Sequence, residues 1–339
     1  MSGKAGTPPN VTVVIPTLNE ADHIASVIKK LVDGDQLAGA SDVNVADGGS
    51  TDGTQEIVKG LMPRFPKLRL LHNPGKTQAR ALNMMLSEEF AWTDILIRCD
   101  AHATYPERYI SRLVNSLEQT GAASVVVPMD AQADVGCFQH GLAWIADTRL
   151  GAGGSAHRGG KQSGWVDHGH HAAFRMAKFR TLGGYDVDFL ANEDAEYDCR
   201  VLNSGGRIWL ESSIRIGYFP RRTPRKLWQQ YFRYGQGRAK TCRKHALRPA
   251  ARQMIPVGHV LLLGGALLSL SLTPFGLLYL GFYGIAVGSA GLWMATSRRN
   301  LCGLAATPAL AIMHIAWGLG FLIETIRGGT RTDKATVIA

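Results

Sequence analysis

The chain has 339 residues, of which 45% are apolar and 19% are charged. This length and composition exclude a mini-protein and a disordered tail, because the chain can bury at least one full hydrophobic core. Its five cysteines include no CxxC pair, which argues against a zinc ribbon, a redox dithiol and a secreted disulfide scaffold. We therefore expect reduced thiols in a cytosolic setting.

The net charge of +10 is concentrated in one segment. Residues 215–252 contain twelve Lys or Arg and no Asp or Glu, so the rest of the chain carries a net charge of −2. A basic face on a soluble nucleic-acid-binding module is one explanation. The segment directly precedes a long apolar stretch, however, which favours a membrane surface with anionic lipid and no nucleic acid.

Residues 1–10 are polar, contain Pro8 and Pro9, and predict a disordered N-terminus without a signal peptide. From residue 11 to about 130, short β-branched runs alternate with helical stretches. Strands are predicted at 11–15, 42–46, 68–71, 94–98 and 124–127, and helices at 21–32, 54–61, 77–89 and 106–118. This order is typical of an α/β, Rossmann-like, doubly wound parallel sheet covered by helices on both faces.

Polar residues follow each predicted strand, at the edge where such a sheet binds ligands. They are Thr17, Asn19 and Glu20 after the first strand, the turn at 47–53 after the second, His72 and Asn73 after the third, and Asp100 and His102 after the fourth. The turn opens with Asp47 and therefore differs from the GxGxxG loop of dinucleotide binders. Phosphates beside this carboxylate need a cation.

Asp100 and His102 are two residues apart, so in an extended segment they point to the same side and can converge on one metal ion. Carboxylate with imidazole suits Mn²⁺ somewhat better than Mg²⁺. An exposed turn without metal is the alternative. His168 or His170 could add a ligand, although an acceptor-binding strand or polar packing also explains the segment 166–171. Six glycines in residues 151–164 predict a mobile loop.

These motifs, in this order, resemble the family 2 glycosyltransferases of the GT-A fold. The likeness runs from about residue 11 to residue 234. It rests on the segments at 14–20, 47–54, 100–102, 183–186 and 192–194, and on 230–234, which resembles the family's QxxRW motif. The chain departs from the family at His102, where a second Asp is common, and at Tyr234, where Trp is common.

The resemblance implies a UDP-sugar donor and a role for each matching residue. Asp47 would contact the uracil or ribose, with Pro16, Thr17, Asn19, Glu20 and Gly49 in the same pocket. Asp100 and His102 would hold Mn²⁺ or Mg²⁺ on the donor diphosphate. Lys76 and Arg80, at the start of a helix, would help to neutralise that diphosphate, and a solvated helix face is their alternative.

On the acceptor side, Asp194 matches the family's catalytic base, and Glu193 could share the acceptor hydroxyls. A helix N-cap is the alternative role for Asp194, and Asp198 is predicted to be a surface charge. Gln230, Arg233 and Tyr234 match the motif that binds the acceptor or the diphosphate.

Residues 253–297 contain no Asp, Glu, Lys or Arg, and predict two membrane helices at 255–272 and 275–295. Buried core helices of a soluble protein are the alternative. Arg298 and Arg299 would return the chain to the cytoplasm. Residues 300–323 are long enough for a third span, although charged residues from Glu324 onward would then lie on the far side. An in-plane or re-entrant helix is the alternative.

The predicted domains are therefore a GT-A domain at 11–220, a basic amphipathic interfacial segment at 221–252, a membrane region of two or three helices at 253–326, and a tail at 327–339. The predicted enzyme sits in a bacterial inner membrane with its catalytic domain on the cytoplasmic face. It would be metal-dependent and inverting, and would move one hexose from a UDP-sugar to a polyprenyl-diphosphate-linked sugar.

The likeness narrows to enzymes of succinoglycan-type exopolysaccharide assembly, which implies transfer of glucose in β-1,3 linkage. A processive polysaccharide synthase is the second hypothesis, although it would need more membrane helices. A non-catalytic membrane scaffold of the same fold is the third.

Overall fold

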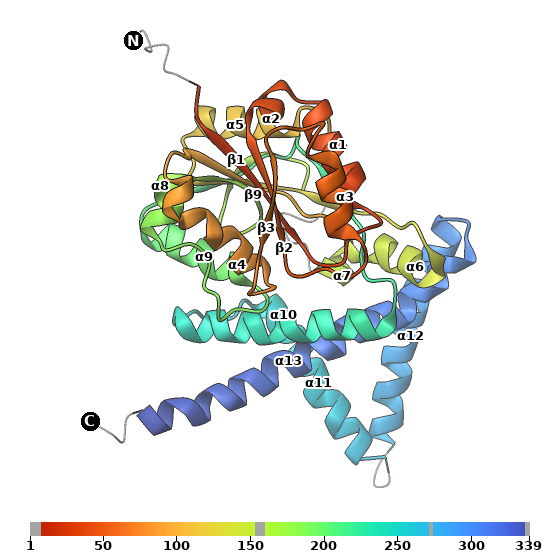
Figure 1. The fold of residues 1–339 in the computed structure, drawn as a ribbon. Coiled ribbons are helices and arrows are strands. Elements are labelled where there is room, and N and C mark those ends of the chain that lie inside the picture. Colours follow the sequence, from red (N-terminus) through yellow and green to blue (C-terminus); the bar gives the residue numbers. More distant parts are fainter. Residues whose placement is uncertain (1–7, 153–159, 271–273, 336–339) are drawn as a thin grey trace. The chain divides into compact units, whose positions relative to one another are not determined.

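The computed structural model of the protein describes residues 8–152, 160–270 and 274–335. The chain forms two compact units (Figure 1). The first contains residues 1–129, 160–188 and 193–218, and the second contains residues 130–159, 189–192 and 219–339. Part of the predicted N-terminal disorder, at 1–7, and part of the predicted mobile loop, at 153–159, lie outside the described residues.

The first unit is built on an eight-stranded sheet with the order β3-β2-β1-β4-β9-β6-β10-β8. A second, three-stranded sheet has the order β5-β11-β7. The strands are β1 Val11–Thr17, β2 Asp42–Asp47, β3 Leu68–His72, β4 Ile95–Arg98, β5 Ala103–Thr104, β6 Ser124–Val127, β7 Met129–Ala131, β8 Gly164–Val166, β9 His170–Arg175, β10 Ile208–Leu210 and β11 Ile216–Tyr218. All five predicted strands are present, with ends that shift by at most two residues.

The large sheet is mixed and not wholly parallel. Strands β1 to β4 pair in parallel, as predicted, but β9 runs antiparallel between β4 and β6. Residues of β9 begin with two histidines and lack the β-branched pattern that identifies the other central strands. Strand direction also depends on the long connection from residue 128 to residue 170, which no local pattern encodes.

Helices cover both faces of this sheet (Figure 1). Val13 and Ile15 pack in one core with Ile28 of α1, whereas Val14, on the opposite face of β1, packs in another core with Phe179 of α8. The helices of this unit are α1 Ile24–Asp33, α2 Gln36–Ala40, α3 Thr54–Leu61, α4 Gln78–Asn83, α5 Tyr109–Thr120, α8 Met176–Thr181 and α9 Glu193–Asn203.

The predicted helix at 77–89 is only partly helical. It begins as α4 and continues as two 3₁₀ turns, η1 Met84–Leu86 and η2 Glu88–Phe90, because Ser87 between them is extended. The short helix α2 has no counterpart in the sequence prediction. Its cap is Asp35, whose carboxylate accepts a hydrogen bond from the backbone N–H of Leu37.

The second unit is helical. It contains α6 Gly136–Ala146, α7 Arg149–Ala152, α10 Pro224–Lys244, α11 Ala251–Leu268, α12 Phe275–Ser297, the 3₁₀ turn η3 Leu301–Ala305 and α13 Ala306–Ala335. Within the described residues, three helical segments are long and apolar enough to cross a membrane: Ala251–Leu268, Gly276–Ser297 and Leu301–Gly328. These agree with the three apolar runs in the sequence.

One cysteine pair corrects the sequence prediction of reduced thiols. Cys137 of α6 and Cys302 of η3 form a disulfide within the second unit, whereas Cys99 and Cys242 are free thiols. The paired residues are 165 positions apart. Rules based on close cysteine spacing cannot detect such a pair, because only the packing of α6 against η3 brings the two residues together.

Candidate active site

Asp47 organises the glycine-rich turn at the carboxyl end of β2. Strand register places it beside Thr17 of β1 and His72 of β3. One carboxylate oxygen accepts hydrogen bonds from the backbone N–H groups of Gly49 and Ser50, both at 2.9 Å, and the other accepts the Ser50 hydroxyl at 2.5 Å. Gly49 has a φ of +89°, a backbone conformation that favours glycine. The turn is therefore held rigidly by its own side chain.

The loop after β1 is tied to this turn. Asn19, which adopts a left-handed backbone with φ 56°, accepts a hydrogen bond on its side-chain oxygen from the N–H of Thr51 at 2.9 Å. The N–H of Glu20 donates to the hydroxyl of Thr54, also at 2.9 Å. The two loops thus form one polar assembly at the strand ends, as the sequence motifs predicted.

Four other donor-side candidates lie on the neighbouring elements. Pro16 and Thr17 end β1, and the buried Thr17 hydroxyl donates to the carbonyl of Ile15 at 3.0 Å. Lys76 is exposed just before α4, and Arg80 is exposed in the first turn of that helix. Their exposure leaves both side chains available to an anion or to solvent.

Arg98, the last residue of β4, is a buried cation that sequence reasoning missed. Its side chain is 6% exposed and donates from Nε and Nη2 to one oxygen of Asp100, at 3.2 and 3.1 Å. Burial alone would lower the pKa of Arg98, but Asp100, Glu193 and Asp194 outweigh burial and raise it above its usual value. The sequence feature that could have identified this buried cation is a single Arg at the end of an otherwise apolar strand.

Asp100 is held in its ionised form. Burial alone would raise its pKa, but Arg98, His170 and His102 overcome burial and hold the pKa well below the usual range. Nε2 of His170 lies 3.4 Å from the second carboxylate oxygen. The N–H of Asp100 donates to the Tyr105 hydroxyl at 2.6 Å, which fixes the backbone of the motif.

His102 links the Asp100 motif to the loop after β1. Its Nδ1 lies 2.8 Å from Oε1 of Glu20, and its side chain is 41% exposed. Within the described residues, no group of three or more His, Cys, Asp or Glu side chains is arranged to hold a metal ion. Mg²⁺ is commonly held by only one or two carboxylates together with substrate phosphates. An ionised Asp100 beside an accessible imidazole therefore fits a metal that the substrate helps to hold.

Glu193 and Asp194 begin helix α9. The carboxylate of Asp194 accepts a hydrogen bond from the N–H of Ala195 at 2.7 Å, and the helix dipole favours negative charge at this end. Burial, and then the charge of Asp194, raise the pKa of Glu193 to about 7, while Arg98 opposes them. Glu193 therefore titrates near neutral pH.

The histidines of the segment 166–171 contact two different carboxylates. His170 faces Asp100, whereas His168 and His171 lie 2.6 Å from the two oxygens of Asp198. The prediction that Asp198 is a surface charge is wrong, since the residue is 1% exposed. The sequence pattern does not indicate whether the face of α9 that carries Asp198 is buried or exposed. The packing of α9 against β9 buries that face.

The remaining acceptor-side candidates belong to the second unit, on α10. The Gln230 amide donates to the Tyr234 hydroxyl at 2.9 Å, and the Asn192 amide donates to the Tyr234 carbonyl at 2.7 Å. Arg233 is exposed. The structure therefore brings Gln230 and Tyr234 into direct contact across one turn of helix and links Tyr234 to Asn192.

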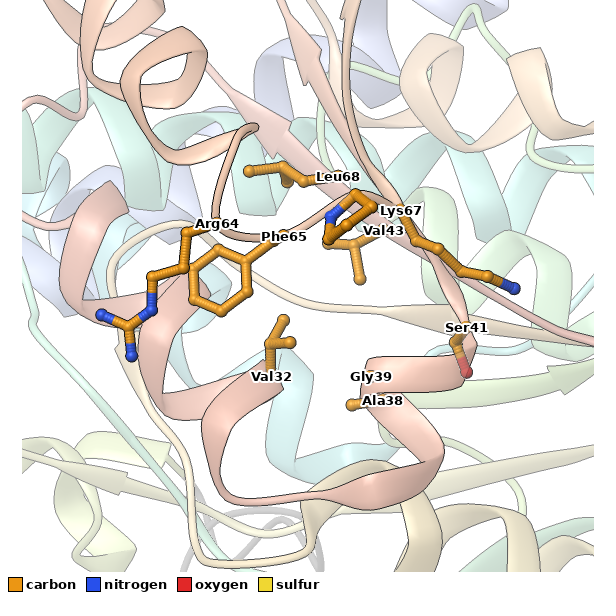
Figure 2. Close-up of a pocket in the computed structure, with 10 residues that line it drawn as sticks. Val32, Ala38, Gly39, Ser41, Val43, Arg64, Phe65, Lys67 and Leu68 are labelled. Carbon is orange, nitrogen blue, oxygen red and sulfur yellow. The ribbon is translucent and has the colours of Figure 1, made fainter.

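A surface pocket of about 180 Å³ lies elsewhere on the first unit (Figure 2). Its walls include Ser41 and Val43, at the start of β2, and Leu68, at the start of β3. Its two cations are already engaged, because Arg64 pairs with Asp33 at 2.8 Å and Lys67 donates to the Ala40 carbonyl at 2.6 Å. The pocket lies at the amino ends of the strands, so it is separate from the polar cluster.

A mixed α/β sheet with an Asp-x-His motif after β4 and paired carboxyls at a helix start defines a glycosyltransferase of the GT-A type. Residues 12–183 match the sequence model of Glycosyl transferase family 2. The chain is 42% identical over 326 residues to the succinoglycan biosynthesis protein ExoA of Rhizobium meliloti (strain 1021), covering 96% of this chain and 98% of that protein. The chain belongs to glycosyltransferase family 2.

Two more distant similarities agree with this assignment. The chain is 23% identical over 336 residues to a dolichyl N-acetyl-alpha-D-glucosaminyl phosphate 3-beta-D-2,3-diacetamido-2,3-dideoxy-beta-D-glucuronosyltransferase of Methanococcus voltae, covering 94% of this chain and 98% of that protein. The mannosyltransferase PcManGT of Pyrobaculum calidifontis, solved with GDP-Man and Mn²⁺, superposes with a TM-score of 0.55 at 21% identity. That superposition covers 91% of this chain and 88% of PcManGT, and supports the fold.

Replacing Asp198 by alanine should destabilise the first unit. Burial alone would raise the pKa of Asp198, but His171 and His168 outweigh it and keep the carboxyl below its usual pKa. Removing one member of a buried ionic group leaves its partners without compensation, so we expect a loss of about 3–5 kcal/mol in the free energy of unfolding. Denaturant unfolding of the purified chain in detergent measures it.

Glu118→Ala is the control, because Glu118 is 51% exposed and pairs with Arg175 at the surface. Its loss should change the free energy of unfolding by at most about 1 kcal/mol. An equally small effect of Asp198→Ala would contradict the buried role of Asp198.

Proposed function

We propose that this glycosyltransferase moves one hexose, with inversion, from a UDP-sugar to a lipid-linked sugar acceptor in the assembly of a succinoglycan-like exopolysaccharide. The cluster of Arg98, Asp100, Glu193 and Asp194 carries the proposal. It combines a carboxylate whose pKa is held well below its usual range, Asp100, with a carboxyl whose pKa is raised to about 7, Glu193. The relative of 42% identity, a succinoglycan biosynthesis protein, supports the pathway. Glucose in β-1,3 linkage is the transfer we propose.

Donor binding is assigned to the assembly formed by the first two loops. Asp47 and Gly49 hold the turn against which a uracil or ribose would lie, and Asn19 and Glu20 close it from the β1 side. Since these groups hydrogen-bond one another, the two loops are held in place and donor binding would order few groups. Lys76 and Arg80 supply positive charge for the diphosphate.

Asp100 and His102 are the residues that would hold Mn²⁺ or Mg²⁺ together with the diphosphate. Such an ion neutralises the charge that develops on the departing nucleotide. Arg98 contributes by keeping Asp100 ionised, and Glu20 contributes by orienting the His102 ring. Neither of these two residues needs to touch the ion to have this effect.

Asp194 is the proposed base. Inversion requires one group to take the proton from the acceptor hydroxyl as that oxygen attacks opposite the leaving phosphate. Asp194 sits at a helix start, where its anion is favoured, and Glu193 beside it would bind acceptor hydroxyls. Gln230, Arg233 and Tyr234 are proposed to bind the acceptor or its diphosphate.

The acceptor is proposed to reside in the inner membrane of a bacterium, with catalysis on the cytoplasmic face. Apolar helices follow the basic segment directly, which supports a membrane protein whose cations stay on the cytoplasmic side. The described residues contain three candidate spans, fewer than a polymer channel would need, and this number favours single addition over processive synthesis.

Transfer should occur from UDP-glucose and should depend on divalent metal. We expect radiolabel from UDP-glucose, tested within a panel of UDP-sugars, to enter the lipid fraction of membranes that contain the acceptor. Excess EDTA should abolish transfer, and Mn²⁺ or Mg²⁺ should restore it. Full turnover in EDTA would contradict the metal assignment, and the absence of both transfer and donor hydrolysis would favour a scaffold.

Asp194→Asn should slow transfer by roughly 10²- to 10⁴-fold, because the amide keeps the shape but cannot accept the proton. The affinity for UDP should change little. Transfer rate and UDP binding, measured on the same detergent-purified chain, separate the two effects. Arg233→Ala should weaken substrate binding as well as the rate, since a guanidinium binds anions.

Asp33→Asn is the matched control for this change, because Asp33 is exposed beside the pocket at the amino ends of the strands. This variant should transfer normally. Near-normal transfer by Asp194→Asn would show that the base lies elsewhere, with Glu193 as the first candidate.

The rate should fall as the pH drops through about 7. The pKa of Glu193 is raised to about 7, so the carboxyl pair loses a negative charge below that pH. Plots of kcat/KM against pH should show this limb for the parent chain. Glu193→Gln should be slow throughout and should lack the limb, whereas an unchanged limb in this variant would assign the titration to another group.

A further inference from the structure

Helices α10 and α13 lie side by side within the second unit (Figure 1). Glycines permit this close approach. A Cβ on Gly235 of α10 would collide with the backbone of Trp317 and Phe321, and a Cβ on Gly320 of α13 would collide with the backbone of Phe232. The two helix backbones therefore touch without intervening side chains.

The same two helices stay together toward their C-terminal ends. Arg243 of α10 donates from Nη2 to the Glu324 carboxylate at 2.6 Å and from Nη1 to the Glu324 carbonyl at 3.2 Å. Its guanidinium also covers Gly328. From Phe232 to Arg243 the contacts on α13 advance from Gly320 to Gly328, so the helices run in the same direction over roughly 16 Å.

The first half of α13 contacts the apolar hairpin of α11 and α12, at Pro256 and Val287, and also contacts elements outside that hairpin. The backbone at Ala306 is in contact with Gly141 of α6. Nε2 of His314 lies 3.1 Å from the carbonyl oxygen of Leu150 in α7. Start, middle and end of α13 are therefore each held by α6, α7 or α10, and none of these three is a candidate span.

The positive charge of α10 determines how deep α10 and α13 can lie in a membrane. Residues Pro224–Lys244 contain seven Lys or Arg and no Asp or Glu. A helix that crossed the bilayer beside α10 would take these cations into hydrocarbon, where each is costly. Since α10 belongs at the headgroups, α13, which accompanies it, belongs at the same depth.

Helices α11 and α12 differ from α13 in what they expose. Leu268 of α11 is 82% exposed, and Phe282 and Ile285 of α12 are each 73% exposed. The buried share is 39% for the α13 candidate span, against 11% and 22% for the spans in α11 and α12. The hairpin of α11 and α12 thus exposes apolar side chains suited to contact with lipid tails. A larger share of α13 is covered by protein.

We infer that α13 lies along the cytoplasmic surface of the membrane with α10, so that the chain crosses the bilayer only twice, outward in α11 and back in α12. The α10–α13 pair is then a platform whose partner is the lipid headgroup region, with cations facing anionic lipid. This topology predicts that the end of the chain is exposed to the cytoplasm. This inference goes beyond the proposed function and does not depend on glycosyl transfer.

The test is the sidedness of three protease-cleavable epitope tags on the full chain. One tag is placed at the N-terminus, one at the C-terminus and one directly after Leu270. Inside-out and right-side-out membrane vesicles are treated with protease. We expect the two terminal tags to be cleaved in inside-out vesicles and the tag after Leu270 to be cleaved in right-side-out vesicles.

The N-terminal tag calibrates the orientation of each vesicle preparation. A C-terminal tag that is cleaved together with the Leu270 tag would show a third crossing and would overturn the inference for α13. A Leu270 tag that is cleaved together with the N-terminal tag would overturn the two crossings of the hairpin. Because the readout is proteolysis, inactive protein would contradict the proposed function without affecting this result.

Discussion

The buried positive charge of Arg98 is the constraint on which the candidate site depends. A guanidinium keeps its proton in proteins, so one that is 6% exposed needs anions around it. Asp100 binds it directly, and Glu193 and Asp194 contribute their charges from the start of α9. One cation thereby draws together the end of β4 and the start of a helix nearly a hundred residues later. It keeps Asp100 ionised, whereas burial and the charge of Asp194 raise the pKa of Glu193 to about 7 against the opposing effect of Arg98.

Around this cluster, the protein keeps its polar loops rigid by hydrogen bonds among themselves. The Asp47 carboxylate accepts hydrogen bonds within its own turn. The Asn19 side chain accepts one from the N–H of Thr51, and Glu20 forms one with the ring of His102. The buried Asp198 does the same for His168 and His171. Carboxylates therefore serve two purposes in this fold. Some are the proposed contacts for substrate or metal, and others position the histidines and backbone groups that line the sheet edge.

In the second unit, electrostatics again limits the arrangement. The cations of α10 cannot follow an apolar helix into hydrocarbon, and the ion pair between Arg243 and Glu324 joins α13 to that helix near its end. Hydropathy treats α13 as equivalent to α11 and α12, since all three are long and apolar. Packing distinguishes them, because α13 alone is covered lengthwise by a basic helix.

The sequence by itself determined the strands β1 to β4 and β6, the motif at each strand end, and the apolar helices. Each of these depends on a local pattern of side chains within a few residues. Only the tertiary structure decided the antiparallel placement of β9, the pairing of Asp100 with Arg98 and His170, the burial of Asp198, and the disulfide between Cys137 and Cys302. Burial, and charge pairs between separate elements, arise from how helices and strands pack, and no local periodicity records which distant partner a side chain will meet.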